Sequence, residues 1–167
     1  MADRKLTTAS YLVLGMVELL EPVTPYELKA FAAQSVVNFW SMPHTQIYTQ
    51  CDRLLEDGLL SEKREAAGRR RRSFSITRDG AKALQAWREE PADMPVELRD
   101  LATLKLFFGA DPASLAEDQM ATHQAKLAEY LAVKNSGLAR EGALASLEAG
   151  IAHEREFVRF WKARLKG

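Results

Sequence analysis

The sequence predicts a mainly α-helical fold with one small β-hairpin, divided into an N-terminal and a C-terminal domain. Apolar residues recur at helical spacing through most of the N-terminal half, where two short segments also flank a turn. The C-terminal half is helical in composition throughout. The chain has 167 residues, of which 47% are hydrophobic, so it can bury a core in one domain or in two small ones.

The first two helices are predicted from their apolar spacing and their caps. Residues Thr8–Leu20 place apolar side chains at i, i+4, i+7 and i+8, with Thr7 or Thr8 as the cap, and Pro22 ends this helix. Thr24 then caps a short second helix that has proline at its first position. A connection follows, and we expect its two aromatic residues to pack under the core: Phe39 and Trp40.

A third helix is expected to begin at His44 or Thr45 and to end at Asp57, where Gly58 is the C-cap. Its apolar side chains fall within about 100° on a helical wheel, which leaves the opposite face free. The apolar residues of this buried stripe are Ile47, Cys51, Leu54 and Leu55.

Two short strands are expected next, at Leu59–Arg64 and Arg71–Thr77, because a turn-like segment separates them. A fourth helix follows at Arg78–Glu89, capped by Thr77. Three helices, a hairpin and another helix are typical of a winged helix-turn-helix domain. We therefore predict such a domain over residues 1–90.

Residues 91–167 are predicted to form a helical domain, with its boundary marked by Pro91 and Pro95. The last helix carries apolar residues at alternating spacings of three and four over about three heptads, interrupted by Glu154. Such a seam favours an antiparallel helical dimerisation domain, and packing within one subunit is the alternative. The predicted dimerisation residues are Leu144, Leu147, Ile151, Val158, Trp161 and Leu165.

Charge is segregated along the chain although the formal net charge is zero, with 23 basic and 23 acidic residues. Between His44 and Arg88 there are ten Lys and Arg but six Asp and Glu, which gives this segment a net charge of +4. A local basic patch is what binds phosphate, so a nucleic-acid partner stays open despite the overall balance.

Four consecutive arginines in the hairpin are the strongest signal for a polyanionic partner. Side chains alternate between the faces of a strand, so Arg70 and Arg72 share a face with Phe74, while Arg69 and Arg71 point the other way. Cations at the tip of a hairpin repel one another and favour contact with a polyanion. The alternative is a solvated run of charge partnered by nearby carboxylates, Glu62 and Glu65.

The exposed face of the third helix is the candidate for reading a DNA sequence, because a helix fits the major groove. Its polar side chains can hydrogen-bond base edges or phosphates, and Tyr48 lies at its margin. A simple solvated helix face is the alternative. Asp52 and Glu56 would repel phosphate, so only the N-terminal half should enter deeply. The candidate residues are Thr45, Gln46, Thr49 and Arg53.

Several short motifs together resemble the PadR family of transcriptional regulators, and the remainder of the chain resembles the helical C-terminal domain of virulence-activator-like members. The N-terminal motifs are Tyr26-Glu27-Leu28, Phe39-Trp40, Ile47-Tyr48, Leu54-Leu55-Glu56-Asp57-Gly58-Leu59 and Arg72–Gly80. Thr24-Pro25 stands where many members have a His-Gly pair.

This resemblance implies a homodimeric repressor that binds a palindromic operator in double-stranded DNA, with the third helix in the major groove and the hairpin as a wing. It also implies that Tyr26 and Tyr48 contact DNA, and that a small aromatic or amphipathic effector regulates the protein. Aromatic residues that could line an effector pocket, rather than serve only as core, are Trp87, Phe107, Phe108 and Trp161.

Other functions are disfavoured by the sequence. It contains no glycine-rich phosphate loop or nucleophile motif, so we expect neither an enzyme nor a cofactor. His123, His153 and Glu154 lack tight ligand spacing, so they are read as surface groups and no metal is expected. Cys51 falls on the buried stripe and is expected to be an inert thiol.

A single cysteine, the absence of a secretory signal pattern and short apolar runs predict a cytoplasmic protein without membrane contact. Two rival functions remain open. A winged helix can serve as a protein-interaction module without DNA binding, although that would favour an apolar exposed face on the third helix. RNA binding is the lesser rival, because the narrow major groove of an RNA helix would not admit the third helix.

Overall fold

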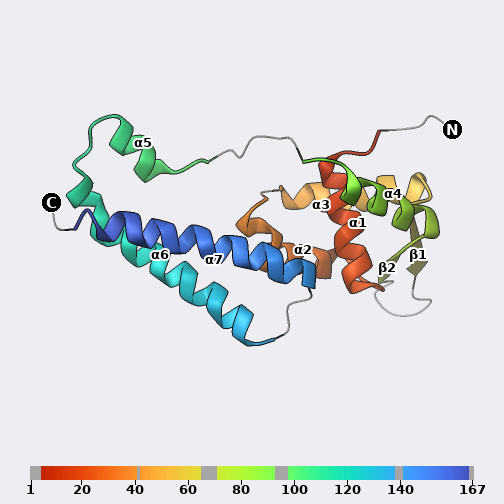
Figure 1. Cartoon of the computed structure of the whole chain (residues 1–167). Coiled ribbons are helices and arrows are strands. Elements are labelled where there is room, and N and C mark those ends of the chain that lie inside the picture. Colours follow the sequence, from red (N-terminus) through yellow and green to blue (C-terminus); the bar gives the residue numbers. More distant parts are fainter. Residues whose placement is uncertain (1–4, 41, 65–70, 93–97, 138–140, 166–167) are drawn as a thin grey trace. The chain divides into compact units, whose positions relative to one another are not determined.

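A computed structural model divides the chain into two compact units, residues 1–94 and 95–167. It describes residues 5–40, 42–64, 71–92, 98–137 and 141–165. The first unit contains α1 (Thr8–Leu20), α2 (Pro25–Gln34), the 3-10 turn η1 (Val36–Asn38), α3 (His44–Glu56), β1 (Leu60–Arg64), β2 (Arg72–Ile76) and α4 (Arg78–Glu89) (Figure 1). The second contains α5 (Leu101–Phe107), α6 (Pro112–Asn135) and α7 (Glu141–Lys162). The predicted mainly α fold with a β-hairpin is confirmed.

Capping side chains set the starts of α1 and α2. Thr7 caps α1 and exchanges hydrogen bonds with Ser10, whose backbone N–H donates to the Thr7 hydroxyl at 3.3 Å. Thr24 and Glu27 form the same reciprocal box at the start of α2, where Pro25 stands at the first position. These pairs satisfy backbone donors that a helix N-terminus leaves unpaired, so the local sequence alone fixes both starts.

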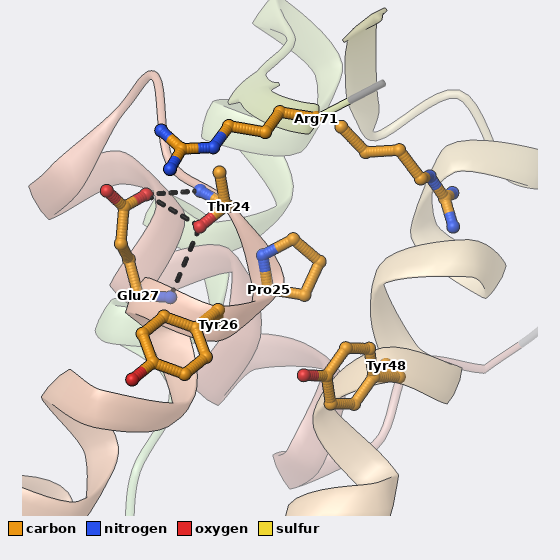
Figure 2. Close-up of a pocket in the computed structure, with 7 residues that line it drawn as sticks. Thr24, Pro25, Tyr26, Glu27, Tyr48 and Arg71 are labelled. Carbon is orange, nitrogen blue, oxygen red and sulfur yellow. Dashed lines mark hydrogen bonds between the residues drawn. The ribbon is translucent and has the colours of Figure 1, made fainter. Parts of the chain in front are cut away.

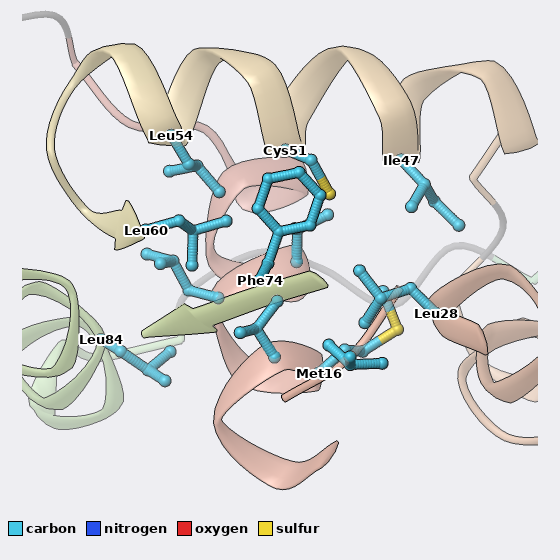
Figure 3. Close-up of a cluster of buried hydrophobic side chains, with 12 residues drawn as sticks. Met16, Leu28, Ile47, Cys51, Leu54, Leu60, Phe74 and Leu84 are labelled. Carbon is cyan, nitrogen blue, oxygen red and sulfur yellow. The ribbon is translucent and has the colours of Figure 1, made fainter. Parts of the chain in front are cut away.

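The core of the first unit is centred on Phe74, which β2 holds completely buried among side chains from α1, α2, α3 and α4 (Figure 3). β1 and β2 pair antiparallel, with Leu60 opposite Ile76. Val23 adds an antiparallel bridge, because its backbone exchanges hydrogen bonds of 3.0 and 2.8 Å with Phe74. The segment between α1 and α2 thereby anchors the base of the hairpin to the core.

Cys51 lies in this core with 1% of its surface exposed. Burial raises the pKa of the Cys51 thiol to about 12, and the neighbouring Asp52 carboxylate adds to the effect. The thiolate is the reactive form of cysteine, so this thiol is held in its unreactive form.

The expectation that Phe39 and Trp40 pack under the core is wrong. Their side chains are 69% and 39% exposed, respectively. The backbone N–H groups of both residues donate hydrogen bonds to the Val36 carbonyl, at 3.1 and 2.8 Å. The side chains of this segment that pack against the core are instead those of Val36 and Met42. The segment before α3 thus keeps an aromatic pair at the surface.

In the second unit, α6 and α7 pack together as an antiparallel helical hairpin (Figure 1). Trp161 of α7 is completely buried beside Ala102 and Ala116, and Ile151 is 4% exposed. Both side chains are therefore core residues of a single subunit, which corrects their assignment to a dimer seam. Of the other seam residues, Leu165 is 41% exposed. The remaining three are half-buried: Leu144, Leu147 and Val158.

Glu154 and His123 are not surface groups, which corrects the sequence-based interpretation. Glu154 is 9% exposed, and its Oε2 lies 2.6 Å from His123 Nδ1 across the α6–α7 contact. The Phe157 ring lies 4.7 Å from the His123 ring, centroid to centroid. The polar position in the apolar seam is therefore satisfied within the subunit, by His123.

Candidate nucleic-acid interface

The third helix presents the two faces that its sequence predicts. Ile47, Cys51 and Leu54 are each 1% exposed and face the core. On the other side, Tyr48 is 45% exposed. The remaining candidate base-reading side chains are also exposed: Thr45, Gln46, Thr49 and Arg53.

Gln50 is a buried polar residue of α3 that sequence reasoning missed. Its side-chain Oε1 accepts a hydrogen bond of 2.9 Å from the Ser10 hydroxyl of α1, and both residues are almost completely buried. A buried polar pair is stable only in a narrow geometry, because leaving either partner unpaired costs about 1–3 kcal/mol. This bond therefore fixes α3 against α1.

An open cavity of about 640 Å³ lies beside α3, between the start of β2 and the start of α2 (Figure 2). Tyr26, 74% exposed, and Tyr48 bring phenol groups to it, and Arg71 brings a guanidinium. Hydroxyl and guanidinium donors around a concave surface suit the oxygens of a phosphodiester. The full lining is Thr24, Pro25, Tyr26, Glu27, Tyr48, Arg71 and Arg72.

The Glu27 carboxylate occupies the N-terminus of α2 at this cavity. Hydrogen bonds from the backbone and hydroxyl of Thr24, together with the positive charge of Arg71, lower the pKa of Glu27 below its ordinary value. The helix end is thus already occupied by an internal anion. Binding of an external phosphate here must rest on the exposed side chains, chiefly Arg71, Tyr26 and Tyr48.

The predicted wing arginines divide into different environments. Arg69 and Arg70 lie outside the described residues. Arg71 is exposed and lines the cavity. Arg72 is 34% exposed, with its guanidinium 5.2 Å from the Phe74 ring centroid, so it shares the face of Phe74 as strand alternation predicts.

The aromatic residues predicted for an effector pocket also have separate environments. Trp87, in the first unit, stacks on Tyr11 with ring centroids 5.0 Å apart. Phe107 and Phe108, in the second unit, are 82% and 78% exposed and meet edge to face. Trp161 is buried in the core of the second unit. Trp161 is therefore not available to a ligand without rearrangement of that core.

Among the described residues, no group of three or more His, Cys, Asp and Glu side chains is placed to hold a metal ion. The same residues contain no helix that is long and apolar enough to cross a membrane.

Comparisons with known proteins find similar chains among transcriptional regulators. The model of the transcriptional regulator PadR-like family matches residues 13–86. The negative transcriptional regulator PadR of Bacillus subtilis is 25% identical over 126 residues, which are 71% of this chain and 69% of that protein.

Solved structures share the fold over nearly the whole chain. Bacillus subtilis PadR in complex with operator DNA superposes with a TM-score of 0.83 at 20% identity, covering 96% of this chain and 98% of that one. The PadR-like regulator BC1756 from Bacillus cereus superposes with a TM-score of 0.78 at 18% identity, covering 99% of this chain and 98% of that one. Bacillus subtilis PadR in complex with p-coumaric acid superposes with a TM-score of 0.76 at 20% identity, covering 96% of this chain and 98% of that one. Residues 13–86 of the first unit are thus similar to the PadR-like family of transcriptional regulators, and the chain has the winged helix fold of the PadR structures.

Proposed function

We propose that this chain is a sequence-specific DNA-binding regulator that binds a palindromic operator as a homodimer and represses transcription. The observation that carries the proposal is the convergence of Tyr26, Tyr48 and Arg71 on one cavity beside the exposed polar face of α3. In this arrangement α3 enters the major groove and reads bases, while the cavity holds the neighbouring backbone. The similar Bacillus subtilis protein is a negative regulator, and its structure with operator DNA has the same fold.

Homodimer formation is supported by exposed apolar side chains on α5 and at Leu98, shortly before this helix. Five large apolar side chains there are 51–82% exposed, although Ala102 on the same helix packs into the core of the second unit. Exposed apolar side chains of this size favour burial against a partner, and a second copy supplies the two-fold symmetry that a palindrome requires. The exposed residues are Leu98, Leu101, Leu104, Phe107 and Phe108. We therefore place the main dimer contact on this α5 surface, with the exposed seam residue Leu165 as a further candidate.

The rival function, a protein-interaction module, fits the first unit less well. Such a module would need an apolar exposed face on α3, but the exposed side chains Thr45, Gln46, Thr49 and Arg53 are polar. Polar groups that hydrogen-bond base edges match DNA better than an apolar partner surface.

Replacing Arg71 with glutamine is expected to weaken binding to operator and random duplexes alike. Losing one phosphate contact should lower the slope of log affinity against log salt by about 0.9. Fluorescence anisotropy at several salt concentrations measures this slope. Arg88→Gln is the matched control, because Arg88 pairs with Glu18 away from the cavity residues. An unchanged slope for Arg71→Gln would remove this residue from the DNA interface.

Regulation by a small aromatic ligand belongs to the same proposal. The similar Bacillus subtilis protein was solved with p-coumaric acid. In this chain, an apolar cavity of about 130 Å³ in the first unit is large enough for one aromatic ring. It is lined by Leu12, Ala32, Ala33, Val36, Val37, Trp40 and Met42.

If this cavity is the effector site, p-coumaric acid should change the fluorescence of Trp40 saturably, because the indole lines the cavity. Ala33→Phe should abolish the change by filling the space, while Gln34→Phe, which adds the same ring at an exposed position outside the lining, should preserve it. Equal responses in both variants would exclude the cavity and leave Trp87, Phe107 and Phe108 as the remaining aromatic candidates.

A further inference from the structure

Arg72 joins the wing to α3. Its Nη2 lies 2.6 Å from Asp52 Oδ1 on α3, and its Nε donates to Glu62 Oε1 on β1. Asp52 and Glu62 come from different elements, while Arg72 itself is the first residue of β2. One guanidinium therefore connects the helix that faces DNA with both strands of the hairpin.

The charge of Arg72 is already compensated. Glu62 also accepts a hydrogen bond from Arg64 Nε at 3.0 Å, so two arginines and two carboxylates form one network. Burial of Glu62 opposes its charge, but the hydrogen bonds from Arg72 and Arg64 outweigh this and lower the pKa of Glu62 below its ordinary value. A phosphate could engage Arg72 only by displacing carboxylates that already hold it.

Arg72 also differs from Arg71 in the contacts that its side chain makes. Its guanidinium lies 5.2 Å from the centroid of the Phe74 ring, and that ring is completely buried. Arg71 is exposed and has no ion pair to any other residue in the described part of the chain. Consecutive arginines thus have different surroundings, and only Arg71 is available to a polyanion without breaking an existing contact.

We propose that Arg72 is a positioning residue that fixes the wing relative to α3 and thereby contributes to discrimination between DNA sequences rather than to phosphate binding. The inference rests on the proposed DNA-binding function. Base contacts by α3 and backbone contacts by the wing must be made at the same time, so the distance between them sets the register of the protein on DNA. A bridge between the two elements restricts that distance.

The test uses Asp52→Asn in the full chain, with a duplex selected from a random pool and a scrambled duplex of the same length. We expect the ratio of the two affinities to fall about fivefold, which is typical of coupling between contacting residues. The salt slope should stay unchanged, because no phosphate contact is lost. A phosphate-binding Arg72 predicts the opposite: release from Asp52 would tighten both complexes equally, and Arg72→Gln would lower the slope by about 0.9.

Glu56→Gln is the matched control, because it removes the same charge from an exposed position of α3 and Glu56 has no ion pair to a described residue. It should leave the affinity ratio unchanged. The double variant Asp52→Asn with Arg72→Gln should be no less selective than Arg72→Gln alone, since both changes break the same bridge. Additive losses would overturn the proposal.

Hydrogen exchange without DNA separates this inference from the proposed function. Asp52→Asn and Arg72→Gln should speed amide exchange in β1 and β2 relative to Glu56→Gln, at an unchanged melting temperature. Unchanged exchange would overturn the bridge even if the chain binds DNA. If the chain binds no duplex at all, the proposed function fails, and the exchange rates still decide whether Arg72 holds the wing.

Discussion

Replacing Gly80 with alanine is expected to lower the free energy of unfolding of the first unit by about 3 kcal/mol. A Cβ at this position of α4 would lie 2.2 Å from the Leu59 carbonyl oxygen and 3.0 Å from Ile76 Cγ1. The carbonyl cannot move freely, because it accepts a hydrogen bond of 3.1 Å from the Thr77 backbone N–H. The close approach at Gly80 is therefore what allows α4 to dock against the base of the hairpin.

Chemical denaturation followed by circular dichroism measures this loss. Gly15→Ala is the matched control, because Gly15 lies inside α1 of the same unit and its Cβ would meet only Leu84 Cδ1, at 4.0 Å. Removing a glycine from a helix interior stabilises by up to about 1 kcal/mol. If Gly80→Ala proves as stable as Gly15→Ala, the packing described for the base of the wing is wrong.

Replacing both Leu101 and Leu104 with glutamate is expected to weaken the proposed homodimer at least about 100-fold, because two charges would be buried in an apolar contact. The two side chains are 65% and 51% exposed in the single chain, so the subunit itself should stay folded. Loss of the dimer should also weaken operator binding, since the two half-sites would no longer be bound by one linked molecule. Sedimentation velocity measures the first effect and DNA titration the second.

The control introduces the same two charges at Ala121 and Ala125, which are exposed on α6. That variant should stay dimeric. A dimer that survives the α5 substitutions would move the interface away from the α5 surface, and loss of the dimer only in the α6 variant would place it on α6.

Local features of this fold are predictable from the sequence because they depend on neighbouring residues. The Thr24-Pro25 start of α2 and the Thr77 cap of α4 are both found as predicted. The buried stripe of α3 is also correct, since a helical wheel determines which side chains share a face. The same reasoning places Arg72 on the face of Phe74.

Contacts between distant segments could not be predicted in this way. Ser10 and Gln50 are 40 residues apart, Arg72 and Asp52 are 20 apart, and His123 and Glu154 are 31 apart. Each pair depends on how distant elements pack, helix against helix or strand against helix, and each residue alone reads as an ordinary polar surface group. The sequence offers Glu62 as a nearby carboxylate for the arginine run, but it could not reveal that Asp52 of α3 also compensates Arg72.

The seam of α7 shows the limit of periodicity most clearly. A repeat of apolar residues shows that one face of a helix is buried, but it does not identify the partner. Here α6 of the same subunit takes that role for Ile151 and Trp161, so Trp161→Asp should disrupt the second unit rather than simply separate a dimer. The exposed apolar surface lies instead on α5. This helix has only seven residues, too few for its apolar repeat to be recognised as a seam in the sequence.

We propose that this chain reads a two-fold symmetric DNA sequence through α3, with Arg71 on the neighbouring backbone. Selection of bound duplexes from a random pool by the purified full chain tests it most directly. We expect recovery of a palindrome whose half-sites are centred about one helical turn, or a multiple of it, apart. Enrichment of no sequence, under conditions where the chain is folded and dimeric, would contradict it and favour the protein-interaction module.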